Sequence, residues 1–390
     1  SARFMMRLIV GVAAIAAQVA GFDLLLGETA GLTVTRTMVG TTPVTVFEPK
    51  SSERAPVVVI AHGFAGSQQL MQPFATTLAR NGYIAITFDF LGHGRNPLPM
   101  PGDVTEGLTI TSALLRELDA IASYARTLSV SDGRLAVLGH SMASDIVIRF
   151  AQAHTETQAT VAVSVFSPVV TAESPRNLLV IVGAIEPSIL SEEGLRIVNL
   201  TAGGNAVAGE TYGKFDDGTA RRLVLARGVE HIGVLYSKDS MIASLDWLND
   251  VFGRKSSGGI DRRGLSLALV FLGLIALAWP LAGMLPVTAD IPAGANLPWK
   301  PLLIAAIMPA ILTPLFLWKL PTEFLPILLG DYLALHFATY GLLTAVAIYY
   351  LRPHSKQLGI SASAPALKWT TIGPAALALT IYQIAAFGYP

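Results

Sequence analysis

The sequence of 390 residues contains no cysteine. This absence excludes a disulfide framework, although it is compatible with reducing and oxidising compartments alike. An excess of charge of one sign is also missing, because 27 lysine and arginine residues balance 27 aspartate and glutamate residues. The sequence has no basic patch, no low-complexity tract and no tandem repeat, so we expect no binding to nucleic acid.

Motifs for cofactors and metals are missing as well. Neither a G-x-G-x-x-G nor a G-x-x-x-x-G-K phosphate loop occurs, and no pair of histidines or carboxylates has the spacing of metal ligands. We therefore expect neither a cofactor nor a metal ion.

Charged residues are scarce, at 14% of the chain against 52% hydrophobic residues, and the mean hydropathy is +0.54. This composition is too apolar for an ordinary soluble protein. The excess lies mainly after residue 263, in four segments that are each long enough to cross about 30 Å of hydrocarbon as a helix. They are Leu265 to Leu285, Pro301 to Trp318, Tyr332 to Leu351 and Trp369 to Tyr389.

A further apolar segment, Leu8 to Leu26, follows Arg3 and Arg7 near the amino end. A secretory signal peptide has the same pattern, but we expect a retained signal anchor, which gives five spans in all. The two arginines favour a cytoplasmic amino end and an extracytoplasmic position for residues 31–253. Basic residues between the last two spans agree with this orientation, whereas the basic residues at 254, 255, 262 and 263 oppose it.

The remaining chain alternates apolar strands with helical patterns, which predicts an α/β fold with a mostly parallel sheet and helices on both faces. An antiparallel hairpin, Leu32 to Met38 with Val44 to Glu48, is expected at its edge. We place an amino-terminal transmembrane anchor at 1–30, the α/β domain at 31–253, a polar glycine-bearing linker at 254–263 and a four-helix transmembrane domain at 264–390.

The most informative motif is Gly139-His140-Ser141-Met142-Ala143, which follows the apolar run Leu135 to Leu138. A strand that turns sharply into a helix at a serine is typical of a nucleophile elbow, where the hydroxyl stands at the end of a sheet. The last position departs from G-x-S-x-G, because Ala143 replaces glycine. A plain strand-to-helix turn is the alternative interpretation.

A second motif, His62-Gly63-Phe64-Ala65-Gly66, follows the buried strand pattern Pro56 to Ala61. Its glycines allow the backbone to bend, so that the Phe64 amide can point at a reacting carbonyl oxygen. The Met142 amide would be the second donor of this oxyanion hole.

Together with Asp89 to Arg95 and a histidine after the last predicted strand, these motifs resemble the α/β-hydrolase superfamily in its lipase and esterase branch. The resemblance covers about residues 32 to 253. It implies that Asp89 and His93 are structural turn residues, and that the catalytic residues follow the chain order serine, acid, histidine. His62 and His140 are expected to shape loops rather than move protons.

That order implies Glu186 as the acid, in the loop after the strand Leu178 to Gly183, where the family normally has aspartate. Glu173 is the next candidate, followed by Asp216 and Asp217, and each of these carboxylates can instead be a solvated loop residue. His231, in the loop after the strand Arg222 to Ala226, would be the base. An amphipathic helix is expected from about Leu235 to Phe252.

Only seven residues separate the expected strand end near Val170 from Leu178, which leaves no room for a cap domain over the site. We therefore interpret the chain as a membrane-anchored serine hydrolase that cleaves carboxylic esters of lipid or amphiphilic substrates through an acyl-enzyme on Ser141. One alternative is a catalytically silent scaffold subunit of a larger membrane assembly. Another is transfer of an acyl group, or cleavage of a peptide or thioester, by the same residues.

Overall fold

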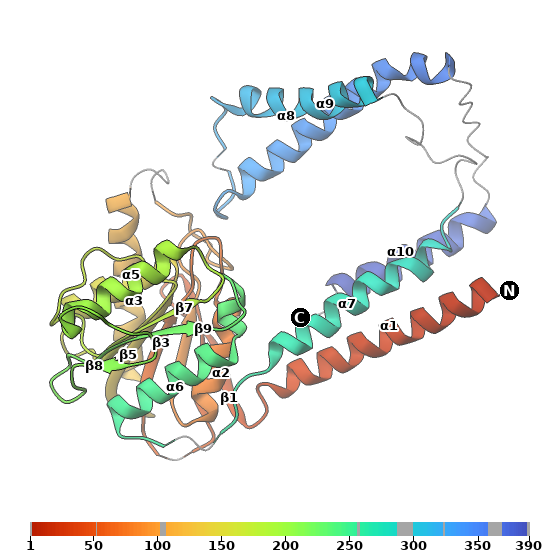
Figure 1. The fold of residues 1–390 in the computed structure, drawn as a ribbon. Helices are drawn as coiled ribbons and strands as arrows, with labels where there is room; N and C mark the ends of the chain where they lie inside the picture. Colours follow the sequence, from red (N-terminus) through yellow and green to blue (C-terminus); the bar gives the residue numbers. More distant parts are fainter. Residues whose placement is uncertain are drawn as a thin grey trace. The chain divides into compact units, whose positions relative to one another are not determined.

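A mixed β-sheet organises the region between residues 32 and 226 in the computed structural model (Figure 1). The structure describes residues 2–51, 53–101, 107–255, 258–286, 299–322, 324–357 and 369–387. Within these residues the sheet has nine strands in the order β1-β2-β4-β3-β5-β6-β7-β9-β8. The strands are β1 Leu32–Val39, β2 Thr42–Pro49, β3 Ala55–Ala61, β4 Ile84–Phe88, β5 Ser131–His140, β6 Ala159–Val163, β7 Leu178–Gly183, β8 Thr211–Tyr212 and β9 Arg221–Ala226.

The strands from β4 to β9 in this order run parallel to one another, and most of their apolar side chains are buried on both faces. Every residue of β3, for example, is buried. Parallel strands covered on both sides need such continuous apolar sequences, which explains the unbroken run from Val57 to Ala61. Because the strands are parallel, their carboxyl ends meet at one edge of the sheet, and the loops that follow them are neighbours there.

Helices cover both faces of the sheet, as the α/β prediction requires. They are η1 Gln68–Met71, α2 Gln72–Arg80, α3 Gly107–Thr127, α4 Met142–Ala153, α5 Ser188–Ala202, η2 Gly233–Tyr236 and α6 Lys238–Phe252. Side chains of α2 and α6, such as Phe74 and Trp247, pack on the face that carries Val58 and Ile60. Side chains of α3 and α4 pack on the face of Val57 and Val59.

Two predicted element ends are wrong. Strand β6 ends at Val163 rather than Phe166, because Ser164 adopts a φ of 55° that an extended strand does not allow. Helix α6 begins at Lys238 rather than near Leu235, because the Ser237 hydroxyl accepts a hydrogen bond from the Asp239 amide and caps the helix there. None of residues 164–177, which connect β6 to β7, is helical.

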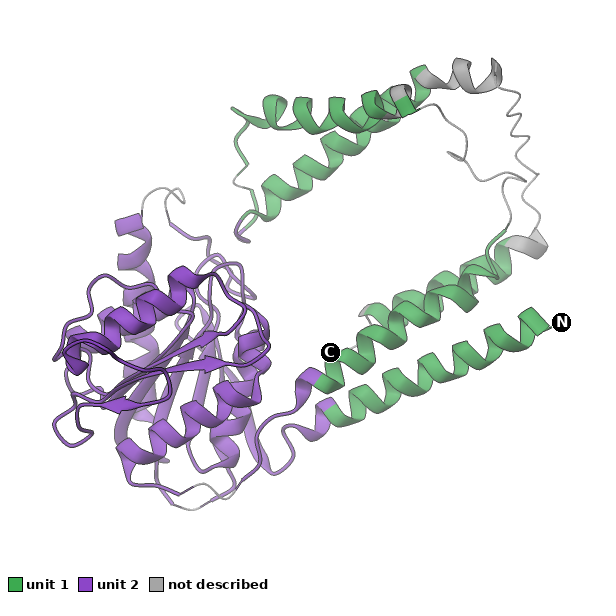
Figure 2. Ribbon diagram, in the orientation of Figure 1, with its two compact units in different colours: residues 1–24, 265–325, 329–390 green, residues 25–264, 326–328 purple. Residues whose placement is uncertain are grey.

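The chain divides into two compact units, shown in Figure 2. One unit comprises residues 25–264 and 326–328 and contains the sheet, whereas the other comprises residues 1–24, 265–325 and 329–390. The residues expected to form the linker, 254–263, therefore belong to the sheet-bearing unit where they are described. The second unit contains most of α1 Ala2–Gly27 and of α7 Arg263–Ala282, together with α8 Trp299–Leu317, α9 Gly330–Gln357 and α10 Trp369–Phe387.

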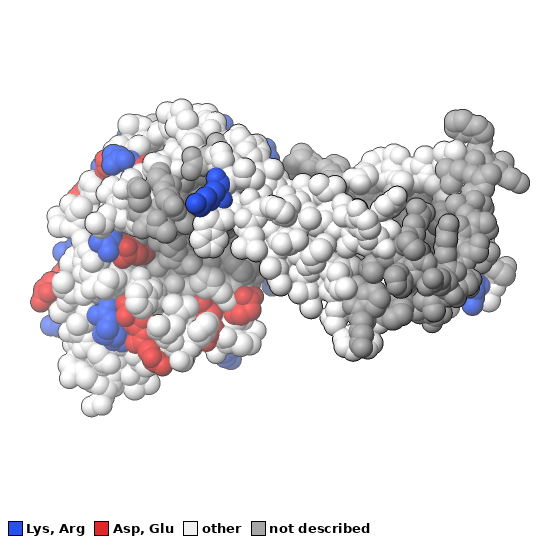
Figure 3. All heavy atoms as spheres, turned by 90° about the horizontal axis from the view of Figure 1, so that it is seen from above, with Lys and Arg blue, Asp and Glu red and all other residues white. Residues whose placement is uncertain are grey.

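Three of the described helices are long and apolar enough to cross a membrane: α1, α7 and the Gly330–Tyr350 part of α9. The apolar segments Leu303–Leu317 and Ile372–Ala386 are shorter, so the count of five spans stays a prediction. In Figure 3, lysine, arginine, aspartate and glutamate side chains are scattered over the sheet-bearing unit, whereas the described helices of the other unit are almost uniformly uncharged on this face.

Within the helical unit, α1 and α7 lie side by side and antiparallel. A Cβ atom at Gly21 would lie 2.8 Å from the Ser266 carbonyl oxygen, and one at Gly273 would lie 2.8 Å from the Ala14 carbonyl oxygen. Only glycine allows the two backbones to approach this closely, which is a common device where helices pack in membranes.

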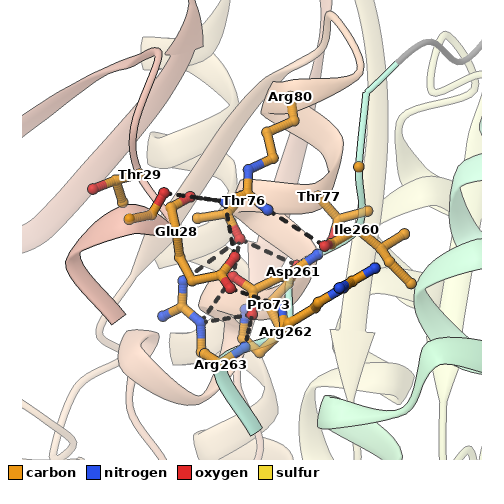
Figure 4. A network of polar contacts seen from close by, with 12 residues as sticks. Glu28, Thr29, Pro73, Thr76, Thr77, Arg80, Ile260, Asp261, Arg262 and Arg263 are labelled. Atoms are coloured by element: carbon orange, nitrogen blue, oxygen red, sulfur yellow. Dashed lines mark hydrogen bonds and ion pairs between the residues drawn. The ribbon is translucent and has the colours of Figure 1, made fainter. Parts of the chain in front are cut away.

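A buried polar network fixes the segment around Asp261 to helix α2 (Figure 4). Asp261 accepts a hydrogen bond from the Thr76 hydroxyl and forms an ion pair with Arg263, with 2.8 Å between Nη2 and Oδ2. Arg80, on the same helix as Thr76, forms an ion pair with Glu28 at 2.8 Å. We call these five residues the α2 network. It joins Glu28, just after α1, and the residues that lead into α7 to one face of α2.

Candidate active site

Ser141 lies in a sharp turn between β5 and α4, at the carboxyl edge of the sheet. Its φ of 53° and ψ of −118° are unfavourable for a residue with a side chain, and such strain costs on the order of 1–3 kcal/mol. The surrounding structure maintains it: the Ser141 amide donates to the Val163 carbonyl at 2.9 Å. A Cβ atom at Gly139 would lie 2.3 Å from the Ala143 carbonyl oxygen, so the turn requires glycine there. The completely buried Ala143 fits where the pattern has its last glycine.

The structure brings Ser141, His231 and Glu186 together, although they are far apart in the sequence. His231 Nε2 lies 2.9 Å from Ser141 Oγ, and His231 Nδ1 lies 2.7 Å from Glu186 Oε2. Because the carboxylate can only accept, Nδ1 carries the hydrogen and Nε2 is free to accept the serine proton. The three side chains therefore form the arrangement of nucleophile, base and acid.

The environment of Glu186 favours its charged form. Burial of this carboxyl works to raise its pKa, but hydrogen bonds from His231, the Gly183 amide and Ser164 outweigh burial, and the pKa lies below its usual value. The carboxylate in turn raises the pKa of His231 above its ordinary value, mainly through their hydrogen bond and against the effect of burial. Glu186 is thus ready to stabilise an imidazolium at position 231.

Two further histidines shape the loops around the site. His140 Nε2 donates to the His231 carbonyl at 2.9 Å, and His62 Nδ1 donates to the Gly63 carbonyl at 2.8 Å. Burial is the main cause that lowers the pKa of each to about 4, so both are neutral near pH 7. His140 thereby fixes the backbone of His231, and His62 Nε2 accepts from the Phe90 amide at 3.0 Å.

The two amides expected to form an oxyanion hole lie on elements that border Ser141. A Cβ atom at Gly63 would lie 3.0 Å from Ser141 Cβ, so the loop that carries Phe64 faces the nucleophile. Met142 is the first residue of α4, where amides lack acceptors within the helix. Within the described residues, the Phe64 amide has no protein acceptor.

The other candidate acids do not take part in this arrangement. Glu173 and Asp216 are exposed, and Asp217 accepts from the amide and hydroxyl of Thr219 at 2.9 and 2.6 Å. Asp89 is buried and accepts from the Gln68 amide at 2.8 Å, while His93 contacts the Leu91 carbonyl at 2.8 Å. Asp89 and His93 are thus turn residues in the structure.

Sequence reasoning missed Ser164, whose hydroxyl donates to Glu186 Oε1 at 2.7 Å. Its position after an apolar strand at the carboxyl edge is the only signal in the sequence that could have indicated it. The same oxygen accepts from the Gly183 amide at 2.7 Å. Both donors occupy Oε1, which leaves Oε2 for His231.

A protein-family model matches part of the chain. The sequence model described as "Serine aminopeptidase, S33" matches residues 52–193, a region that includes Ser141 and Glu186 but ends before His231. No curated protein sequence matches the chain.

Solved structures are similar to part of the chain at low identity. A protein from Thermus thermophilus has 16% identity and a TM-score of 0.43, and the match covers 57% of this chain and 99% of that protein's chain. A hypothetical protein from Pseudomonas aeruginosa has 12% identity and a TM-score of 0.41, covering 57% and 94%. A putative dienelactone hydrolase from Klebsiella pneumoniae has 17% identity and a TM-score of 0.41, covering 57% and 99%.

Proposed function

We propose that this chain is a membrane-anchored serine hydrolase of the α/β-hydrolase superfamily, which cleaves carboxylic esters through an acyl-enzyme on Ser141. The observation that carries the proposal is the continuous line of hydrogen bonds from Glu186 through His231 to Ser141, at 2.7 and 2.9 Å. Each distance is within the range that proton transfer requires.

The reaction would begin with attack of Ser141 Oγ on the ester carbonyl carbon, while His231 Nε2 takes the hydroxyl proton. The amides of Phe64 and Met142 would stabilise the negative charge that develops on the carbonyl oxygen. His231 then gives its proton to the departing alcohol, which leaves an acyl group on Ser141. A water molecule, deprotonated by His231, attacks that acyl group and releases the acid, and the proton returns to Ser141.

Exposed apolar side chains next to the site support a substrate with an apolar group. Phe64 is 47% exposed, Ile185, beside Glu186, is 64% exposed, and Ile232, beside His231, is 46% exposed. Phe166, two residues after Ser164, is 57% exposed. We call these four residues the apolar rim. Exposed apolar groups gathered around a reactive site indicate contact with an apolar ligand or surface.

The helical unit supports a membrane location, because three of its described helices are long and apolar enough to span a bilayer. An anchored hydrolase with an apolar rim suits lipid or amphiphilic esters that reside in the bilayer. We also propose the extracytoplasmic side for the sheet-bearing unit, on the basis of Arg3 and Arg7.

Labelling of the full-length protein in detergent with a fluorophosphonate tests the nucleophile. We expect Ser141→Ala to abolish labelling and the hydrolysis of p-nitrophenyl esters, and His231→Ala to reduce both by on the order of 10³-fold or more. Ser144→Ala, which removes a hydroxyl that bonds the Ser141 carbonyl at 2.6 Å, is the control that should keep labelling. A folded wild-type protein that is never labelled would contradict the proposal and favour a silent scaffold.

The apolar rim is tested by a series of p-nitrophenyl esters with acyl chains of increasing length. We expect kcat/KM to rise with chain length, and Phe166→Ser and Ile185→Ser to remove most of that rise while they keep activity on the acetate. Val207→Ser is the control, since Val207 is 54% exposed but lies in the loop before β8, outside the site. If all three variants change the dependence of kcat/KM on chain length equally, the apolar rim does not bind the acyl chain.

Peptide hydrolysis is the second candidate, favoured by the description of the matching family as a serine aminopeptidase. An aminopeptidase needs a carboxylate free to bind the substrate ammonium group, whereas Glu230, the acid next to His231, already accepts from the amides of Ile232 and Gly233 at 2.7 Å. Cleavage of aminoacyl p-nitroanilides faster than of the matching esters would establish the peptidase instead.

A further inference from the structure

Ser164 occupies a strained position directly behind the proposed acid. It follows β6, its amide donates to the Ile181 carbonyl of β7 at 2.7 Å, and its φ is 55°. Glycine adopts this conformation freely, whereas a serine does so at a conformational cost. The residue is 3% exposed, and its hydroxyl donates to Glu186 Oε1 at 2.7 Å. A strained serine at a place suited to glycine points to a role for its hydroxyl.

We propose that Ser164 is a positioning residue that allows a glutamate to serve as the acid of this site, by holding Oε1 so that Oε2 faces His231. The inference rests on the proposed hydrolase function. It concerns a residue that does not touch the substrate or the reacting atoms and acts only through Glu186.

The geometry of Glu186 explains why a second anchor is needed. Glutamate has one more rotatable bond than the aspartate usual in this family, so its carboxylate has more orientations to lose. The Gly183 amide, at 2.7 Å from Oε1, belongs to the same turn as Glu186, in which the Glu186 amide donates to the Gly183 carbonyl at 3.0 Å. Ser164 comes from a different strand end. It therefore fixes the carboxylate relative to the sheet and not only relative to its own turn.

The groups that surround the base are few, which makes its titration a usable signal. Glu186 approaches His231 from the loop after β7, His140 from the end of β5, and Glu230 from the same loop as His231. His140 is neutral near pH 7, and Glu230 remains unchanged in the variants below. A change in the titration of His231 would therefore report on the contact with Glu186.

The decisive variant is Ser164→Gly, which removes the hydroxyl and relieves the strained backbone together. We expect a melting temperature equal to or above that of the wild type, with a loss in kcat of about tenfold, the size of one lost hydrogen bond near a charge, and little change in KM. The acid limb, which is the fall of kcat/KM as the pH decreases, should move to lower pH. A Glu186 carboxylate that is held less firmly raises the pKa of His231 less. Ser164→Ala should give the same kinetics as Ser164→Gly, while the unfavourable backbone conformation remains.

Ser167→Ala is the matched control, because Ser167 lies in the same loop and its buried hydroxyl donates to another carboxylate, Asp145 Oδ1, at 2.6 Å. It should lower the melting temperature and leave the acid limb in place. If Ser164→Gly keeps the wild-type kcat and the wild-type acid limb, the inference is overturned. Fluorophosphonate labelling of the protein would still support the hydrolase function in that case. A shift of the limb to higher pH would also overturn it, since the hydroxyl would then act by withdrawing charge from the carboxylate. Failure of labelling in the wild type would remove the proposed function itself.

Discussion

At the scale of single residues, the sequence indicated Ser141 by its motif, and the resemblance to α/β-hydrolases implied Glu186 and His231 by chain order. Each of the three follows a strand whose carboxyl end lies at the same edge of the sheet. The residues that hold them were not predictable in the same way. The role of Ser164 follows from its φ of 55° and its bond to Glu186, whereas the sequence shows only that this serine comes after an apolar strand. Contacts between distant loops depend on tertiary structure, so residues that support the site in this way can be identified only from a structure.

The titration of His231 gives a prediction about pH dependence. Its base function needs the neutral ring, so kcat/KM falls as the pH drops through the pKa of His231. Since the hydrogen bond to Glu186 raises this pKa, we expect the wild-type midpoint above the ordinary histidine value of about 6.5. The measurement is kcat/KM of ester hydrolysis against pH.

Glu186→Gln should lower activity on the order of 10³- to 10⁴-fold and move the midpoint down. Gly183 and Ser164 both donate to one oxygen, so the amide oxygen of glutamine would take that place and turn its NH₂ group toward His231 Nδ1. Nδ1 would then have to accept, which leaves Nε2 protonated and unable to act as base. Glu230→Gln, which also removes a charge near His231, is the control and should change the midpoint only slightly. Equal profiles for the two variants would argue against Glu186 as the acid.

At the scale of elements, the strands and helices of the sheet-bearing unit were predictable because continuous apolar runs and alternating helical patterns mark them. The ends of these elements were less predictable. Ser164 ends β6 by its backbone conformation, and Ser237 caps the start of α6. The role of α2 was also not predictable. Its polar residues Thr76 and Arg80 resemble an exposed helix face, whereas the structure uses them to bind Asp261 and Glu28.

The α2 network gives a prediction about stability. Asp261→Asn should lower the free energy of unfolding of the sheet-bearing unit by about 3 kcal/mol, because the buried Arg263 would lose its charged partner. Thermal or urea unfolding of the full-length protein in detergent measures this. Asp239→Asn removes the partner of the exposed Arg227, an ion pair at 2.9 Å, and should leave stability unchanged within error. If Asp261→Asn and Asp239→Asn are equally stable, the charged groups of the α2 network are exposed to solvent rather than buried.

At the scale of the whole molecule, composition alone indicated a membrane-bound part, since apolar segments without charge are long enough to span a bilayer. The pairing of α1 with α7, across more than two hundred intervening residues, was not predictable. It depends on where small residues such as Gly21 and Gly273 meet a facing backbone. The orientation in the membrane stays a prediction.

The absence of cysteine makes this pairing directly testable, because introduced thiols have no competing partner. A Cβ atom at Gly11 would lie 3.7 Å from Pro280 Cβ, a separation that suits a disulfide, so Gly11→Cys combined with Pro280→Cys should form a disulfide on mild oxidation in native membranes. The cross-linked chain would migrate differently on a non-reducing gel. Gly11→Cys with Val270→Cys is the register control: Val270 lies ten residues, or about 15 Å, from Pro280 along α7 and should not cross-link. Cross-linking of the control pair as readily as the first would contradict the antiparallel register and with it the close approach at Gly21.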